Sequence, residues 1–229
     1  MTDAADAATP PAGAGLTLNA IEARVLGCLI EKAATTPDVY PLTLNAIQLA
    51  CNQKTARDPF MQVELGEVGH TLRMLEQKKL VREVRGARAL RYEHTIDAAL
   101  NLQTRSRAVL ALLLLRGPQT QNELLTRSER LADFPDLESI DDTLQRLSAR
   151  EPPLVVRIGR AVGQREDRYM HLLCGPVSAE MLQTRHAEGA DDSARRELDT
   201  RPDLEARVDE LERLVADLQR RLGAQNEAE

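Results

Sequence analysis

The sequence contains few aromatic residues. They make up 2% of the 229 residues, and tryptophan is absent. Aromatic side chains provide the stacking platforms that hold single-stranded nucleic acids, so this composition argues against such a surface. The cores must then be built from leucine, valine, isoleucine and alanine, which favours helices.

Residues that commonly carry catalysis are also scarce. The four histidines are scattered, with no i, i+4 pair and no cysteine at ligand spacing. A zinc site needs three or four convergent ligands, so none is expected. There is no glycine-rich phosphate loop and no serine–histidine–aspartate arrangement. We expect a protein that is not an enzyme and holds no cofactor or metal.

Targeting and membrane-spanning signals are absent as well. The N-terminal stretch lacks the basic start and apolar core of a secretory signal. The longest apolar run, residues 108–115, is too short to cross a bilayer. Cys28, Cys51 and Cys174 are an odd number of widely spaced cysteines, which indicates buried reduced thiols. We expect a cytoplasmic protein that does not contact a membrane.

The charge is unevenly distributed along the chain. The net charge is −6, and residues 176–229 alone carry 14 acidic and 8 basic residues. Residues 17–175 carry 22 basic and 20 acidic residues, so the central part is close to neutral with local basic clusters. An overall acidic charge therefore does not exclude binding to nucleic acid.

Hydrophobic periodicity predicts the elements of the central part. A helix is expected from Leu18 to about Thr36, then an extended stretch before a short helix capped by Thr43 or Asn45. Asp58–Pro59 reads as the start of a further short turn, with Phe60 in the core beneath. A helix over 65–79 and strands over 80–84 and 90–94 complete the unit.

The same order then repeats. The apolar positions of the third helix correspond across the two copies: Val68, Thr71, Leu72 and Leu75 with Ile140, Thr143, Leu144 and Leu147. Two copies of helix–helix–helix–hairpin indicate tandem winged-helix domains, mainly α with small β-hairpins (α+β). The expected divisions are a disordered tail (1–15), a first domain (16–100), a second domain (101–175), a linker (176–202), a C-terminal helix (203–224) and a short tail (225–229).

The C-terminal helix carries a short heptad seam. Valine or leucine at the a positions and leucine at the d positions favour a parallel two-stranded coiled coil, which predicts a homodimer. The alternative is an amphipathic helix that packs on its own chain, because fewer than three heptads are marginal alone. The predicted seam is Leu204, Val208, Leu211, Val215, Leu218 and Leu222.

Several long motifs resemble one family of bacterial proteins. The stretches VLGCLIEKAATTPDVYPLTLNAI (25–47), CNQKTARDPFM (51–61), LLLRGPQTQNELLTRSERLADF (113–134) and RYMHLLCG (168–175) are similar to the YceH family. The likeness covers about residues 17–175. It implies two winged-helix domains in a cytoplasmic protein, whereas the N-terminal tail and the heptad seam lie outside it.

The third helix of the first copy and its hairpin form a candidate site for double-stranded DNA. In a winged helix the third helix enters the major groove while the hairpin touches the backbone. Residues 73–91 contain seven basic and two acidic residues, and the loop between the second and third helices adds polar donors. The predicted contacts are Gln53, Lys54, Arg57, His70, Arg73, Gln77, Lys78, Arg82, Arg85, Arg88 and Arg91.

A protein-docking adaptor remains the alternative to a DNA-binding protein or transcriptional regulator. Glu64 and Glu67 stand at the start of the same helix, where they would repel phosphate. The second copy is more acidic still at that place, with Asp133, Asp136, Glu138, Asp141 and Asp142. Acidic residues also favour a helix N-terminus, so they have a structural explanation.

Overall fold

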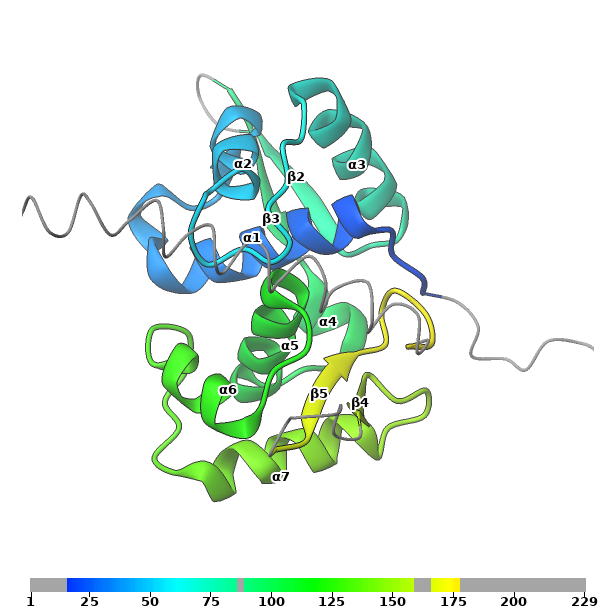
Figure 1. Ribbon diagram of the computed structural model, residues 1–229. Helices are drawn as coiled ribbons and strands as arrows, with labels where there is room; N and C mark the ends of the chain where they lie inside the picture. The colour runs from blue at the N-terminus through cyan, green and yellow to red at the C-terminus, as the bar shows by residue number, and fades with distance from the viewer. Residues whose placement is uncertain (1–15, 86–88, 159–165, 178–229) are drawn as a thin grey trace, which may run out of the picture. The chain divides into compact units, whose positions relative to one another are not determined.

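A computed structural model describes residues 16–85, 89–158 and 166–177 (Figure 1). These residues form seven α-helices and two small antiparallel sheets, so the expected α+β class is confirmed. The predicted N-terminal tail, C-terminal helix and dimerisation seam lie outside the described residues, as does nearly all of the predicted linker.

The first half builds a three-stranded sheet beside three helices. Its strands follow the order β1-β3-β2, with Leu42 opposite Tyr92 and Val81 opposite His94. The elements are α1 (Ala20–Thr35), a 3-10 helix η1 (Pro37–Val39), β1 (Leu42–Thr43), α2 (Leu44–Cys51), α3 (Leu65–Gln77), β2 (Val81–Arg85) and β3 (Leu90–His94).

The second half repeats this order after a short connecting helix. Its two strands pair in antiparallel fashion, and an isolated bridge joins Gln119 to Tyr169 in place of the short first strand. The elements are α4 (Ile96–Leu100), α5 (Thr104–Arg116), α6 (Gln121–Ser128), α7 (Leu137–Ser148), β4 (Val155–Ile158) and β5 (Arg168–His171).

Equivalent side chains begin the equivalent second helices. Thr43 caps α2 by accepting from the Ala46 amide, and Thr120 caps α6 by accepting from the Glu123 amide. A threonine at this position satisfies an amide that has no partner within the helix. The prediction that Thr43 or Asn45 caps the second helix is therefore confirmed for Thr43.

The two halves also use the same arginine contact. Arg91 donates to the Pro41 carbonyl at 2.6 Å, and Arg168 donates to the Pro118 carbonyl at 2.9 Å. Each arginine thus ties the hairpin of its half to the segment before the second helix. These matching contacts make the internal repeat a property of the structure as well as of the sequence.

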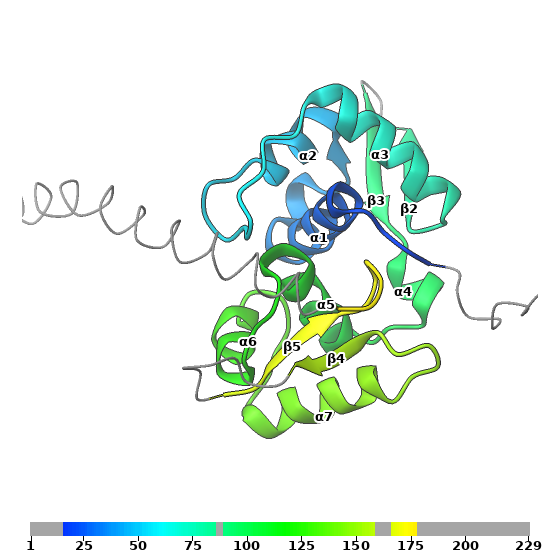
Figure 2. The ribbon, with the colours of Figure 1, turned by 45° about the vertical axis from the view of Figure 1, so that its right-hand side comes forward.

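The halves share one hydrophobic core, in which α1 packs against α5 (Figure 2). Gly27 lies at this contact, where an added Cβ atom would stand 2.9 Å from Leu115 Cγ. The absence of a side chain at residue 27 therefore permits the close approach of the two helices. In both views α3 lies at one end of this pair of halves and α7 at the other.

The loop between α2 and α3 differs from the prediction. Residues 60–64 form no helix after Asp58–Pro59, and the Phe60 side chain is exposed instead of buried. The loop is held by residues outside it, because the Asp58 amide donates to the Leu115 carbonyl at 2.8 Å and Arg24 of α1 donates to the Pro59 carbonyl at 2.5 Å. Tertiary hydrogen bonds therefore prevail over the local helix signal.

The thiol prediction holds for two of the three cysteines. Cys28 and Cys51 are buried free thiols, whereas Cys174 is half-buried. Among the helices that the structure describes, none combines the length and apolar character that crossing a membrane requires.

Candidate nucleic-acid interface

Helix α3 buries one face and leaves the other uncovered by the described residues. Val68, Leu72 and Leu75 are at most 1% exposed, and Thr71 is buried with them. At about 100° per residue, the remaining positions fall on the opposite side of the helix. That outer face carries the exposed residues Gly66, His70, Arg73 and Gln77.

Acidic side chains occupy the beginning and the edge of this face. Glu64 and Glu67 form a capping box, in which the Glu67 carboxylate accepts from the Glu64 amide at 2.9 Å. These residues therefore have a local structural role at the helix start. Glu76 is also exposed and stands beside Gln77. A phosphate backbone would meet these charges as well as Arg73.

Lys78 is engaged in an ion pair and is not part of the open face. Its Nζ atom lies 2.7 Å from both carboxylate oxygens of Glu22 and donates to the Thr17 carbonyl. Glu22 is 2% exposed, so a buried carboxylate holds this ammonium. The predicted role of Lys78 in DNA contact is corrected accordingly: it ties the end of α3 to the start of α1.

The hairpin provides one open basic side chain among those that the structure describes. Arg85 is exposed at the end of β2, whereas Arg82 pairs with Glu93 across the strands. Arg91 donates to the Val39 and Pro41 carbonyls and has a structural role, which corrects its assignment. Arg88 lies outside the described residues.

The loop after α2 does not contribute Arg57 to any surface. Arg57 is 1% exposed, and its guanidinium binds Glu31, Gln53 and the Ala50 carbonyl. The prediction that Arg57 meets phosphate is therefore wrong. Gln53 and Lys54 are exposed, but Gln53 accepts a hydrogen bond from Arg57 at 2.6 Å.

The predicted DNA-contact residues therefore lie in two separate places. His70, Arg73 and Gln77 share the outer face of α3, and the neighbouring β2 ends at Arg85. The loop that carries Lys54 is instead bound to α1 and α5. The run of basic residues over 73–91 also contains Lys79, which is exposed directly after α3 and was not among the predicted contacts.

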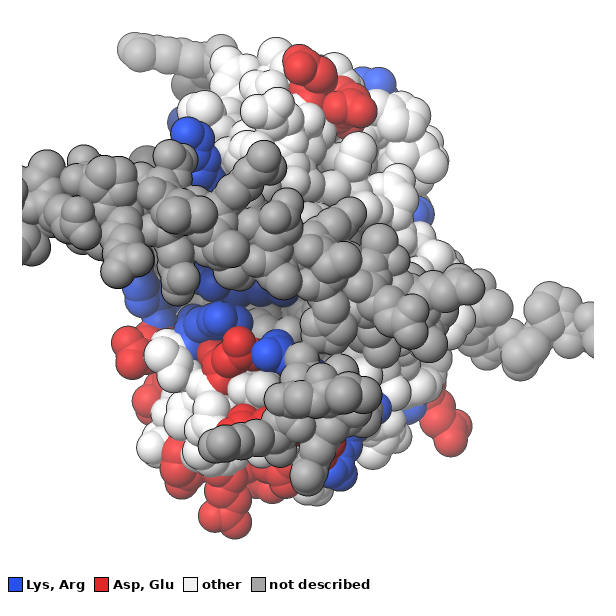
Figure 3. All heavy atoms as spheres, viewed as in Figure 1, with Lys and Arg blue, Asp and Glu red and all other residues white. Residues whose placement is uncertain are grey.

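The corresponding face of the second half is acidic. Glu138 and Asp142 are exposed on α7, and Asp141 accepts a hydrogen bond from Gln121 at 2.6 Å. Figure 3 shows acidic side chains gathered over the end of the molecule where α7 lies. Arg157 on β4 pairs with Asp167, so its charge is offset as well.

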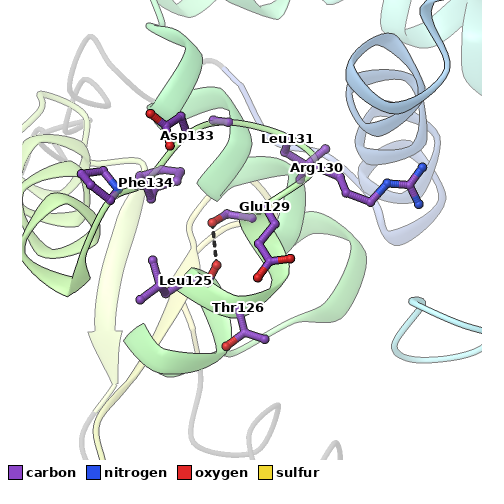
Figure 4. Close-up of a pocket in the computed structure, with 10 residues that line it drawn as sticks. Leu125, Thr126, Glu129, Arg130, Leu131, Asp133 and Phe134 are labelled. Atoms are coloured by element: carbon purple, nitrogen blue, oxygen red, sulfur yellow. Dashed lines mark hydrogen bonds between the residues drawn. The ribbon is translucent and has the colours of Figure 1, made fainter.

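A hollow of about 680 Å³ lies in the segment that joins α6 to α7 (Figure 4). Two of its polar side chains bind nearby backbone carbonyls. Ser128 donates to the Leu125 carbonyl at 2.8 Å, and Thr126 donates to the Asn122 carbonyl at 3.0 Å. Arg105, whose guanidinium stacks over the Phe134 ring, binds the Asp133 carbonyl. The lining therefore explains how the loop is held and does not present a set of polar groups that converge on a ligand.

Metal binding is limited by the positions of the side chains. Across residues 16–85, 89–158 and 166–177, no group of three or more histidine, cysteine, aspartate or glutamate side chains is placed to hold a metal ion.

Sequence comparisons identify related proteins over most of the chain. A family model described as "Protein of unknown function, DUF480" matches residues 18–164. A UPF0502 protein of Mesorhizobium japonicum is 54% identical over 209 residues, covering 90% of this chain and 95% of the relative. A UPF0502 protein of Stenotrophomonas maltophilia is 52% identical over 90% of this chain and 92% of its own. A third UPF0502 protein, from Ectopseudomonas mendocina, is 56% identical over 83% of this chain and 88% of the relative.

Proposed function

The chain belongs to the DUF480 family, and we propose that it is a non-enzymatic, cytoplasmic DNA-binding protein built on two tandem winged-helix domains. The family resemblance that the sequence motifs indicated is confirmed by these matches. The DNA-binding role, the regulatory role that would follow from it and the winged-helix assignment are our inferences.

The repeated order of elements supports the winged-helix proposal. Each half places its third helix before an antiparallel hairpin, and the equivalent contacts of Arg91 and Arg168 hold the hairpin in the same way. In such domains the third helix enters the major groove and the hairpin lies near the backbone. We assign residues 16–100 and 101–175 to the two domains.

The observation that carries the DNA proposal is the open outer face of α3. His70, Arg73 and Gln77 are exposed there, and their side chains offer the donors and acceptors that read base edges. Lys79 and Arg85 flank the face and suit phosphate contacts, which position a protein without reading sequence. Among the residues that the structure describes, Arg73, Lys79 and Arg85 have no carboxylate partner. Three phosphate contacts predict that the logarithm of affinity falls with the logarithm of salt with a slope of roughly −3.

The test is a salt titration of the full chain on duplex DNA. Fluorescence anisotropy with a mixed-sequence duplex should show binding at about 50 mM salt that weakens steeply by about 200 mM. An Arg73→Ala, Arg85→Ala double variant should reduce the salt slope by about 2. Arg146→Ala, which removes an exposed arginine from α7, is the matched control and should leave binding unchanged. Absence of binding at about 50 mM salt would refute the proposal.

A protein adaptor is the second candidate, and the surface near α2 favours it. Leu49 is 71% exposed, and Phe60 and Leu65 are 39% and 38% exposed. Exposed apolar side chains that gather into one contiguous patch mark a site of contact with another protein. A Leu49→Asp variant that retains full DNA affinity but loses a co-purifying protein would support the adaptor.

The C-terminal heptad seam supports a further proposal, that two chains form a homodimer. Sedimentation of the full chain and of a 1–200 truncation tests it, because only the full chain contains Leu204 to Leu222. We expect a dimeric mass for the full chain and a monomeric mass for the truncation. Two monomeric masses would exclude the coiled coil.

A further inference from the structure

Basic residues gather where the two halves of the chain meet. Three helices each carry one in the last turn: Lys32 in α1, Arg116 in α5 and Arg127 in α6. Figure 3 shows basic side chains collected at this level of the molecule, near α1 and α6. The partially negative end of a helix favours such charges, which explains their positions in the sequence. It does not provide hydrogen-bond partners for the guanidinium groups.

Arg116 is the basic residue of this junction that lacks a partner. Its side chain is half-buried, and among the described residues it makes no hydrogen bond and no ion pair. The fully buried side-chain nitrogen atoms without a partner include none from Arg116, so its guanidinium group reaches solvent. A guanidinium group carries five N–H donors. A ligand that accepts hydrogen bonds can therefore approach this side chain.

One glutamine links the end of α5 to Arg127. Gln119 Nε2 donates to the Gly117 carbonyl at 3.4 Å, and its Oε1 atom accepts from Arg127 at 2.8 Å. Gly117 directly follows Arg116, so the two arginines belong to the same end of α5. Arg127 also donates to Glu123 at 3.4 Å. These contacts fix the Arg127 guanidinium and leave it with further N–H donors.

Arg130 adds a third guanidinium group to the junction. It is exposed and has no carboxylate partner among the described residues. In Figure 4 its side chain points away from the hollow and toward α1, whereas the Glu129 side chain points in another direction. Glu31, near the end of α1, is already bound by Arg57 at 3.0 Å and 2.5 Å. The junction therefore holds arginines that neighbouring carboxylates do not neutralise.

The surroundings of Arg116 make its charge unfavourable. Burial lowers the pKa of Arg116, and the charges of Arg127 and Arg57 lower it further. The charges of Glu31 and Asp58 act in the opposite direction without restoring the usual pKa. A partly buried charge without a counterion is costly, and an anion in contact with it relieves that cost.

We propose that Arg116, Arg127 and Arg130 bind a phosphate group at the junction of the two halves. Planar guanidinium groups suit this ligand, because their paired N–H donors match two phosphate oxygens at once. The proposal does not depend on the outer face of α3, which none of these residues shares. The phosphate group can belong to a small molecule or to the backbone of a nucleic acid, and the experiments below separate these sources.

The direct test is thermal unfolding of the full chain in inorganic phosphate at constant pH and ionic strength. A ligand that binds the folded state raises Tm in a saturable manner. We expect saturation within about 10 mM phosphate, where the general exclusion of phosphate from protein surfaces has little effect. Arg116→Ala should weaken the apparent phosphate affinity about tenfold, because charge-assisted hydrogen bonds are lost.

Arg73→Ala is the matched control for this measurement. It removes an exposed arginine from the α3 face and should leave the phosphate response unchanged. Loss of the DNA interface and loss of the phosphate site therefore give different results. A wild-type chain without a saturable response would overturn the proposal, and so would equal responses of the wild type and Arg116→Ala.

Duplex DNA identifies the source of the phosphate group. If the site binds backbone phosphate, Arg116→Ala should weaken duplex binding, and inorganic phosphate should compete with the duplex for the wild-type chain. If the site binds a small phosphorylated molecule, Arg116→Ala should abolish the thermal response and leave duplex affinity unchanged. Either result, together with the saturable response, supports the site.

Asp58 provides a test in the opposite direction. Its amide donates to the Leu115 carbonyl at 2.8 Å, directly before Arg116, and its carboxylate is exposed. That charge repels an anion at Arg116, so Asp58→Asn should increase phosphate affinity about threefold while it keeps the amide contact. Asp142→Asn removes an exposed carboxylate from α7 and should have no effect. Unchanged or weaker phosphate binding by Asp58→Asn would contradict an anion placed at Arg116.

Discussion

The two halves of this chain have equivalent buried positions and different surfaces. Val68, Leu72 and Leu75 face the core from α3 as Ile140, Leu144 and Leu147 face it from α7. The outer face of α3 carries His70, Arg73 and Gln77, whereas the corresponding face of α7 carries Glu138 and Asp142. A repeat therefore preserves what packing requires, since interiors tolerate little change in volume, and its outer faces are free to diverge.

The first helices of the two halves differ in their buried residues. Helix α5 buries a continuous apolar stretch over 108–115, whereas α1 buries Glu22 and Arg24 among its apolar residues. These charges are held by Lys78 of α3 and by carbonyls of the α2 end and the following loop. The first half thus organises its loops with buried charge, whereas no lysine, arginine, aspartate or glutamate is buried among the described residues of the second half.

The largest expected effect on stability comes from removing the buried guanidinium group of Arg57. Arg57→Ala should lower the free energy of unfolding by about 3 kcal/mol, because it deletes a buried guanidinium and leaves its partners unpaired. Lys54→Ala, three residues earlier and exposed, should change it by less than about 0.5 kcal/mol. Urea unfolding measures both, and equal effects would contradict the structural role given to Arg57.

A smaller loss is expected at the contact between the halves. Gly27→Val should cost about 1–3 kcal/mol, because its side chain would overlap the Leu115 and Leu114 side chains of α5. Gly66→Ala is the control, since an added Cβ atom there meets nothing within 4 Å. A neutral Gly27→Val variant would show that the two halves do not pack closely in solution.

The difference between the outer faces can be exaggerated by charge reversal. Glu76→Lys should increase affinity for duplex DNA about fivefold at low salt, because it replaces a repelling charge beside Arg73 by an additional phosphate contact. Asp142→Lys makes the same change on the outer face of α7 and should have no effect. Equal gains would mean that net charge alone, and not the α3 face, governs binding.

The smallest expected effect is a pH dependence that involves one histidine. Burial lowers the pKa of His94, the charge of Asp97 opposes this, and the charge of Arg107 adds to it. The unfolded chain therefore binds the proton more readily, and stability is lost as the pH falls below about 6.5. His94→Gln should weaken the decrease in the urea midpoint between about pH 7.5 and 5.5. Parallel pH profiles for wild type and His94→Gln would contradict this.

Much of the fold could be predicted because its signals are local. The third helix, its buried residues and the hairpin that follows appear in the structure close to where periodicity placed them. The positions of single histidines do not by themselves indicate the repeat. His94 and His171 occupy equivalent places, opposite Val81 and Val155. Each histidine lies two residues after an arginine–tyrosine pair, Arg91–Tyr92 or Arg168–Tyr169, and this shared spacing is visible in the sequence.

The candidate site could be predicted only in part. Exposure of His70, Arg73 and Gln77 follows from the spacing of the buried residues on α3. The spacing does not show which basic residues remain exposed without a partner. Lys78 pairs with Glu22, 56 residues away in the sequence, and Arg91 binds the Pro41 carbonyl, 50 residues away. Spacing along the chain contains no information on such partners.

The sequence by itself determined the order of the repeated helices and strands, the threonine cap of the second helix and the face of the third helix that turns inward, because periodicity and capping act within a few residues. Only the tertiary structure decided that Arg57, Lys78 and Arg91 are structural and that the buried Arg24 side chain binds the Cys51 and Pro59 carbonyls. An arginine in a loop is equally compatible with solvent, phosphate or a buried carboxylate, and the choice depends on groups that folding brings to it from distant parts of the chain.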